Sequence, residues 1–292
     1  SFPTRRSSDL PQIKITPFYW KSETDNSLYQ NKRANGHIEL EDDLTSAIIN
    51  KLGKEPKVSG KITIEGTASD NVRVDELRIT IPGFKNGAEF TIATRSVDGK
   101  NWTSAGNMAN DGWACEVTDD TFAKEGNTLK WKFHWDTAKI AGVAVENVAV
   151  KVKAKDKGQA SLNGGQVDYK TVNESTVATY SMDVVPYITG VETWNRASSG
   201  LKNNNIRAAS GKYSVIKGNI HDFITIKGFN LNPSSVRIVA SGNVANATST
   251  SGIELSFSGI ASDYTSFMLS NNSKKSGYLE LFTNGIRSLN NI

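Results

Sequence analysis

The chain has 292 residues, of which 37% are hydrophobic and 22% are charged, and its formal net charge is +4 at neutral pH. The length allows two domains of ordinary size, since domains run to roughly 100–200 residues. The sequence holds no Lys/Arg run typical of nucleic-acid binding, and no apolar run of the ~18 residues that a membrane span requires. The single cysteine, Cys115, excludes a disulfide within the chain.

The first ten residues, SFPTRRSSDL, differ from everything that follows them. Two arginines resemble the charged start of a signal peptide, but no apolar stretch and no small-residue cleavage site come after them. The codons TCT TTC CCT ACA CGA CGC TCT TCC GAT CT encode these residues and resemble the ligation adapter of short-read sequencing libraries. We therefore interpret residues 1–10 as a sequencing artefact and expect the gene to be cut at its front.

Residues 11–55 give the least regular pattern of the chain. NGHIEL at 35–40 is typical of one strand. DDLTSAIINKLG predicts a helix over 42–53, because an Asp can cap its start, an apolar stripe follows, and Gly53 can end it. We interpret residues 11–55 as the remnant of a preceding module with a connector.

Residues 56–185 alternate between apolar and polar side chains in short runs that turn residues separate. The clearest run is LKWKFHW, in which Leu129, Trp131, Phe133 and Trp135 alternate with polar residues. KITIEG, LRITI and VAVKVKAKD follow the same pattern. Such strands are half buried, so the sequence predicts antiparallel sheets with one face in water.

Two long stretches of this region carry a family resemblance. VSGKITIEGTASDNVRVDELRITI resembles the opening of bacterial immunoglobulin-like domains, and WDTAKIAGVAVENVAVKVKAKDKG is similar to their later strands. The resemblance covers both ends of 56–185. We expect the middle, residues 84–127, to hold extra strands or a long insertion.

Residues 186–292 resemble a second module, the immunoglobulin-like domain shared by plexins and transcription factors. The similarity rests on PYITGVET, FITIKGFNLNPSSVRI and SGYLELFTNGIRS, and the loop 195–219 is longer than is usual for that family. Together the two resemblances imply an all-β fold of tandem immunoglobulin-like antiparallel β-sandwiches. We expect the second sandwich to be truncated at its C-terminus.

Histidines and other residues of the types that act in catalysis do not form a known catalytic motif in this sequence. His37, His134 and His221 fall in three different modules, and motifs for zinc hydrolases, serine hydrolases or phosphate loops are missing from the sequence. We therefore expect no catalytic site and no enzyme.

Calcium is the one cofactor for which the sequence offers candidate ligands. If the ASDN and AKDKG loops lie at the same end of a sandwich, four oxygen ligands converge. These candidate ligands are Asp70, Asn71, Asp75 and Asp156. Against this, Asp and Asn in such turns usually bond to their own backbone, and two lysines flank the last of the four.

Tryptophans are the second candidate site. Trp102 and Trp113 lie near glycine and asparagine, and exposed indole rings in loops can stack on sugars. Against this, tryptophan side chains are mostly buried in folded proteins.

From the two resemblances we expect a non-catalytic structural spacer or adhesion module of a larger exported bacterial surface protein, located outside the cell or on its surface. Its partners would be neighbouring domains of the same chain, and glycans or host and envelope proteins. Nucleic acid and a membrane span are not expected. The alternative is a carbohydrate- or protein-binding module accessory to a surface enzyme.

Overall fold

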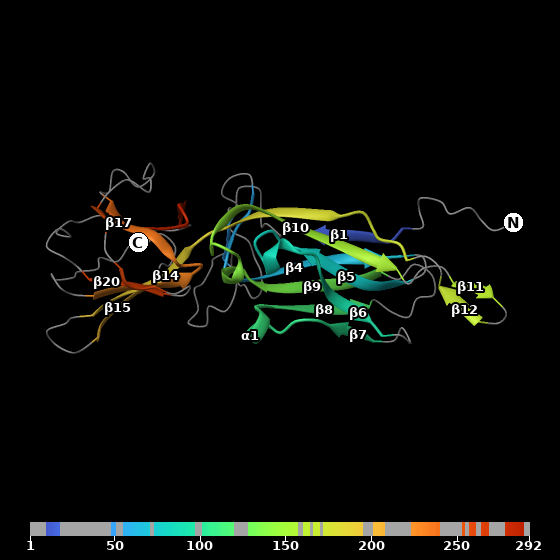
Figure 1. Cartoon of the computed structure of the whole chain (residues 1–292). Helices are drawn as coiled ribbons and strands as arrows, with labels where there is room; N and C mark the ends of the chain where they lie inside the picture. The colour runs from blue at the N-terminus through green and yellow to red at the C-terminus, as the bar shows by residue number, and fades with distance from the viewer. Residues whose placement is uncertain are drawn as a thin grey trace, which may run out of the picture. The chain divides into compact units, whose positions relative to one another are not determined.

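The structure is a computed structural model, and it describes most of the predicted strands (Figure 1). The described residues are 10–17, 48–50, 55–70, 73–96, 101–119, 128–156, 160–163, 166–169, 172–194, 201–207, 223–239, 253–254, 257–260, 264–268 and 278–288. Strands dominate them, which confirms the all-β class. Their helices are one short turn each, namely η2 (Lys85–Gly87), α1 (Met108–Asp111) and η3 (Thr137–Lys139). In this part of the chain no helix has the length and apolarity to span a membrane.

The chain folds as two compact units. The first consists of residues 1–18, 63–136 and 149–181, and the second of residues 19–62, 137–148 and 182–292. Segments 19–62 and 137–148 thus group with the C-terminal part of the chain. The domain boundaries expected from the sequence stay a prediction.

One sheet has four strands in the order β1-β4-β9-β8. They are β1 (Gln12–Thr16), β4 (Lys61–Ser69), β9 (Thr128–Asp136) and β8 (Trp113–Asp119). The expected alternation in β9 is confirmed, because Leu129, Trp131, Phe133 and Trp135 are all buried.

A second sheet has seven strands in the order β2-β3-β13-β10-β5-β6-β7. They are β2 (Ile48–Asn50), β3 (Lys57–Ser59), β13 (Ala178–Val184), β10 (Val145–Asp156), β5 (Val74–Thr80), β6 (Phe90–Arg95) and β7 (Trp102–Ser104). In the first unit Phe90 of this sheet contacts Trp113 and Phe133 of the other, with ring centroids 5.0 and 6.4 Å apart. The apolar faces of two sheets therefore enclose one core, as in a sandwich.

The second unit contains two further sheets, ordered β15-β14-β16-β20-β19 and β18-β17-β21-β22. The first is formed by β15 (Leu201–Arg207), β14 (Tyr187–Trp194), β16 (Phe223–Phe229), β20 (Tyr264–Met268) and β19 (Phe257–Ile260). The second is formed by β18 (Ile253–Glu254), β17 (Pro233–Val239), β21 (Tyr278–Thr283) and β22 (Ile286–Arg287). In the first unit, β11 (Ala160–Asn163) and β12 (Gln166–Tyr169) pair with each other as a separate two-stranded sheet.

The structure corrects one expectation for residues 11–55. The predicted helix over 42–53 is wrong where it is described, because 48–50 form β2, paired with β3 from Ile48 opposite Ser59. β1 and β2 are strands of the two sheets above, and the interpretation of residues 11–55 as the remnant of a preceding module with a connector stays a prediction. Pairing with neighbouring strands outweighs the weak apolar stripe that suggested a helix. The expected strand at 35–40 lies outside the described residues.

The two units repeat one local arrangement. ITIEG in β4 and ITIKG in β16 each place a glycine opposite the isoleucine of an antiparallel neighbour, Ile15 of β1 or Ile188 of β14. A Cβ added at Gly66 would lie 2.0 Å from the carbonyl oxygen of Lys14, and one at Gly228 would lie 2.0 Å from that of Tyr187. Only glycine permits so close a backbone approach, which fixes where these strands meet.

Candidate functional site

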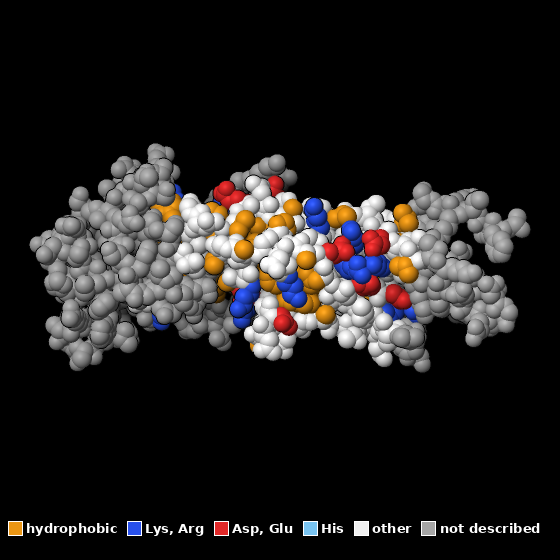
Figure 2. Space-filling view, in the orientation of Figure 1, with side chains coloured by type: hydrophobic (Ala, Val, Ile, Leu, Met, Phe, Trp, Pro, Cys, Tyr) orange, Lys and Arg blue, Asp and Glu red, His pale blue; other side chains and the backbone are white. Residues whose placement is uncertain are grey.

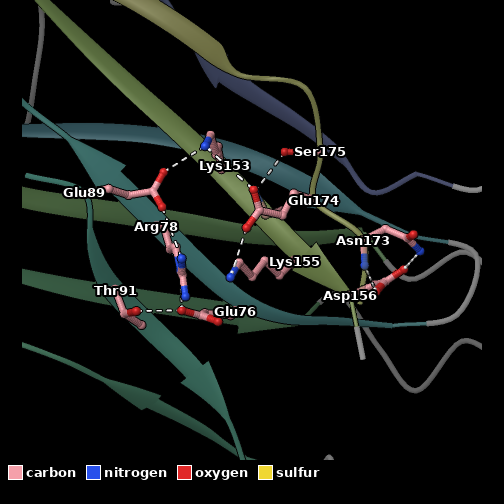
Figure 3. A network of polar contacts seen from close by, with 11 residues as sticks. Glu76, Arg78, Glu89, Thr91, Lys153, Lys155, Asp156, Asn173, Glu174 and Ser175 are labelled. Carbon is pink, nitrogen blue, oxygen red and sulfur yellow. Dashed lines mark hydrogen bonds and ion pairs between the residues drawn. The ribbon is translucent and has the colours of Figure 1, made fainter. Parts of the chain in front are cut away.

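Charged side chains form a ladder across the outer face of β5, β6 and β10 (Figure 3). Alternation along each strand turns its apolar residues into the core and these charges outward. Figure 2 shows the red and blue side chains gathered on this face. We call this set the charged ladder; it consists of Glu76, Arg78, Glu89, Lys153, Lys155 and Glu174.

The ladder is held by short contacts, one within β5 and the others between segments that lie side by side. Arg78 Nε donates to Glu76 Oε1 at 2.6 Å, and Arg78 Nη1 donates to Glu89 Oε2 at 3.2 Å. Lys153 Nζ lies 3.0 Å from Glu89 Oε1, and Lys155 Nζ lies 3.0 Å from Glu174 Oε1. Three acids thus face three bases, and the charges of the ladder cancel.

Hydrogen bonds in the ladder lower the pKa of two carboxylates, Glu76 and Glu89. Burial raises the pKa of Glu76, but hydrogen bonds from Arg78 and Thr91 outweigh it, and the net pKa lies below the usual value. Burial also raises the pKa of Glu89, and hydrogen bonds from Lys153 and Arg78 again lower the net value. Both carboxylates therefore stay ionised near neutral pH and bind their basic neighbours.

A second polar cluster joins the end of β10 to residues 173–175. Asp156 is 4% exposed, and its two carboxylate oxygens accept the backbone N–H of Asn173 at 2.7 Å and its side-chain Nδ2 at 2.6 Å. Ser175 Oγ accepts the backbone N–H of Ala154 at 2.9 Å. These contacts attach residues 173–175 to β10, as Figure 3 shows.

The candidate calcium ligands lie partly as expected. β10 ends at Asp156 opposite Val74, the first residue of β5, so the loop that leads from β4 into β5 and the loop after Asp156 meet the seven-stranded sheet at the same end. Asp70 is buried, and its Oδ1 accepts the N–H of Arg73 at 3.1 Å. This is the local backbone contact that the simpler interpretation of the loop predicts.

The other candidate ligands bind basic or amide groups. Asp75 accepts two hydrogen bonds from the guanidinium of Arg73: Nε donates to Oδ1 at 2.6 Å, and Nη2 donates to Oδ2 at 3.0 Å. Asp156 is engaged by Asn173, while Asn71 lies outside the described residues. Within the described residues no three His, Cys, Asp or Glu side chains group as metal ligands. Calcium binding stays a prediction that this arrangement does not favour.

The two candidate sugar-binding tryptophans have different environments. Trp113 is 3% exposed and packs against Phe90 and Phe133, so the expectation that its ring is available at the surface is wrong. The reason is its place in β8, where it alternates inward with Cys115. Trp102 is half-buried at the edge strand β7, and the guanidinium carbon of Arg95 lies 4.8 Å from its ring centroid.

His134 is the described histidine, and it faces outward from β9 as the alternation predicts. Its Nδ1 lies 2.9 Å from Thr63 Oγ1, and its Nε2 lies 3.4 Å from Glu116 Oε1. His37 and His221 lie outside the described residues. The expectation of separated histidines stays a prediction.

One asparagine in the second unit has a buried role that the sequence patterns do not predict. Asn230 is 0% exposed, and its Oδ1 accepts the N–H of Gly60 at 3.0 Å and the hydroxyl of Ser59 at 3.2 Å. Thr137 Oγ1 lies 2.9 Å from the same oxygen and 2.7 Å from the Gly60 carbonyl, so its single hydrogen is shared between the two. Asn230 Nδ2 donates to the Val143 carbonyl at 2.7 Å.

The backbone around this cluster is strained. Asn230 has φ +52° and Val143 has φ +65°. A left-handed conformation is a rare one for a β-branched residue and costs about 1–3 kcal/mol. The Val143 carbonyl nevertheless meets Asn230, so the surrounding contacts must supply the energy that holds it there.

No protein-family model matches the sequence, and no curated protein matches it at a significant level. The resemblance to two immunoglobulin-like families therefore stays a prediction. What is established is an all-β chain with sandwich-like packing of its sheets.

Proposed function

We propose that this chain is a non-catalytic structural spacer or adhesion module of a larger exported bacterial surface protein. The supporting observation is the charged ladder, in which three carboxylates and three basic groups bind one another across a sheet face. Catalytic sites hold charged groups that converge on a substrate position, with pKa values shifted toward the working pH. Here the pKa values of Glu76 and Glu89 move away from it.

The cluster around Asn230 also supports a structural role. Its buried hydrogen bonds join segments 87 to 171 residues apart in the sequence. A satisfied buried polar network rigidifies the fold around it. Rigidity is the property that a spacer requires.

Small-angle scattering on the whole chain tests the spacer role. A single compact globule of this length has a radius of gyration of about 19 Å. We expect a radius well above that value. A measured radius close to 19 Å would contradict the proposal.

A carbohydrate-binding function is the second candidate, and Trp102 is the observation that favours it. Its half-buried ring lies at the edge strand β7, beside the arginine and aspartate pair Arg95 and Asp75. Sugar sites combine aromatic rings with such hydrogen-bonding groups. Retention of the chain on a glycan array, lost in Trp102→Ala but kept in Thr103→Ala, would establish it.

A further inference from the structure

The segment from Pro56 to Gly60 is held on one side by β13. The Asp183 N–H donates to the Pro56 carbonyl at 2.8 Å, and the Val185 N–H donates to the Val58 carbonyl at 2.9 Å. Lys57 Nζ lies 3.8 Å from Asp183 Oδ2. The two strands run parallel, with Lys57 opposite Asp183.

The next residues of the same segment are held by the buried asparagine. Ser59 and Gly60 both donate to Asn230 Oδ1, and Gly60 accepts the N–H of Thr137 at 3.1 Å. Phe229 packs against Gly60, since a Cβ there would lie 3.2 Å from its ring. The segment is therefore bound by backbone, side chain and packing at once.

The parallel direction of β3 and β13 determines how this segment responds to tension. Parallel strands begin at the same end. Once β1 and β2 have been pulled away from β4 and β3, tension along the chain pulls β3 by the residues before it and β13 by the residues after it. The two strands are then pulled in opposite directions along their axes. The two hydrogen bonds between them then stretch together, whereas bonds of a hairpin pulled at its open end break one after another.

We propose that segment 56–60 is the load-bearing element of this chain, clamped between β13 and Asn230. The inference rests on the proposed function, because a spacer on a cell surface carries tension. In this arrangement residues 57–184 cannot extend until the hydrogen bonds to β13 and to Asn230 give way. Asn230 is a positioning residue that holds the segment in line with β13.

Single-molecule force spectroscopy on the full chain, held at its two ends, tests the clamp. Breaking the clamp releases residues 57–184, which are 128 residues (184 − 57 + 1) or about 45 nm of extended chain. We expect this release at a higher force than the opening of residues 186–292. At a fixed force, Asn230→Ala should speed the release about tenfold or more, because hydrogen bonds to three segments are lost.

Ile92→Ala is the matched control, because it removes buried core volume in β6, a strand that β10 and β5 separate from β13. Its equilibrium stability falls, but we expect the rate of release under force to change far less than in Asn230→Ala. If Asn230→Ala fails to fold, Ser59→Ala removes one of the bonds and should give a smaller change in the same direction. Equal acceleration by the clamp and control variants, or release of 57–184 before any other segment, would overturn the inference.

This outcome is separate from that of the scattering experiment. A chain with a large radius of gyration and no clamp keeps the spacer role and loses the load-bearing segment. A compact chain with a force-resistant release loses the spacer role and keeps the clamp.

Discussion

Replacing Gly66 by alanine should detach β1 from its sheet. The added Cβ would lie 2.0 Å from the Lys14 carbonyl oxygen and 2.5 Å from Cζ2 of Trp131. The nearer atom belongs to the backbone, so no side-chain rotation can relieve the clash. Either the two strands move apart, or the core around Trp131 shifts.

The size of the effect follows from what β1 contributes. Overpacking a well-packed site costs about 1–3 kcal/mol. Releasing β1 exposes Ile13, which is 8% exposed when paired, and burial of such a side chain is worth about 1.5–3 kcal/mol. The five freed residues regain about 1–2 kcal/mol of backbone entropy each, and the loss of their hydrogen bonds to β4, at about 0.5–1.5 kcal/mol each, cancels most of that gain. We expect a net destabilisation of about 2–3 kcal/mol.

Hydrogen exchange combined with urea unfolding measures both parts. In Gly66→Ala the amides of β1 should lose protection while those of β9 keep theirs. Gly87→Ala is the control, because no atom lies within 4 Å of its added Cβ and its φ of +68° adds only the left-handed cost of about 1–2 kcal/mol. Full protection of β1, with a stability change below about 0.5 kcal/mol, would refute the reasoning.

Four further predictions concern the charged ladder and the candidate sites. The lowered pKa values of Glu76 and Glu89 add stability that is present above their unfolded value of 4.5 and is lost as pH falls through the folded values. The free energy of unfolding, measured by urea titration, should therefore fall by a few tenths of a kcal/mol as the pH drops below about 4.5. The fall should be smaller in Glu76→Gln. Asp156→Ala should cost about 1–3 kcal/mol and expose residues 173–175 to limited proteolysis, whereas the exposed Glu146→Ala should not. Calorimetric titration with millimolar calcium should give no heat and no change in melting temperature, because Asp75 and Asp156 already bind N–H donors; a saturable heat would restore the metal site. Trp113→Ala should cost about 3–5 kcal/mol and Trp102→Ala clearly less by thermal unfolding, since the first ring is buried and the second is half exposed.

The alternation of apolar and polar residues predicted those strands in which every second side chain is buried in the core. In β9 every second residue is apolar and buried, so local pattern and tertiary packing agree. The glycine beside Trp113 suggests an exposed loop, whereas the alternation of Trp113 with Cys115 and Val117 in β8 predicts the buried side chain that is found. For residues 48–50 the pairing with β3 decides the structure, and that pairing cannot be seen in the local sequence.

The polar contacts were harder to foresee than the strands. Asp156 and Asn173 lie 17 residues apart, and Asn230 reaches partners up to 171 residues away. Asparagine in a turn ordinarily bonds to its own neighbours, so no local pattern predicts that Asn230 reaches Gly60. Such pairs depend on how strands are ordered in sheets, which periodicity does not determine.

The position of the chain's one cysteine has a consequence for the proposed role outside the cell. Cys115 is 2% exposed in β8, and burial raises the pKa of its thiol to about 12. Because the thiolate is the reactive form, oxidants and alkylating reagents meet an inert sulfhydryl. Under the proposed export, passage from a reducing interior to an oxidising exterior would neither crosslink two copies of the chain nor alter its fold, and folding needs no disulfide catalyst.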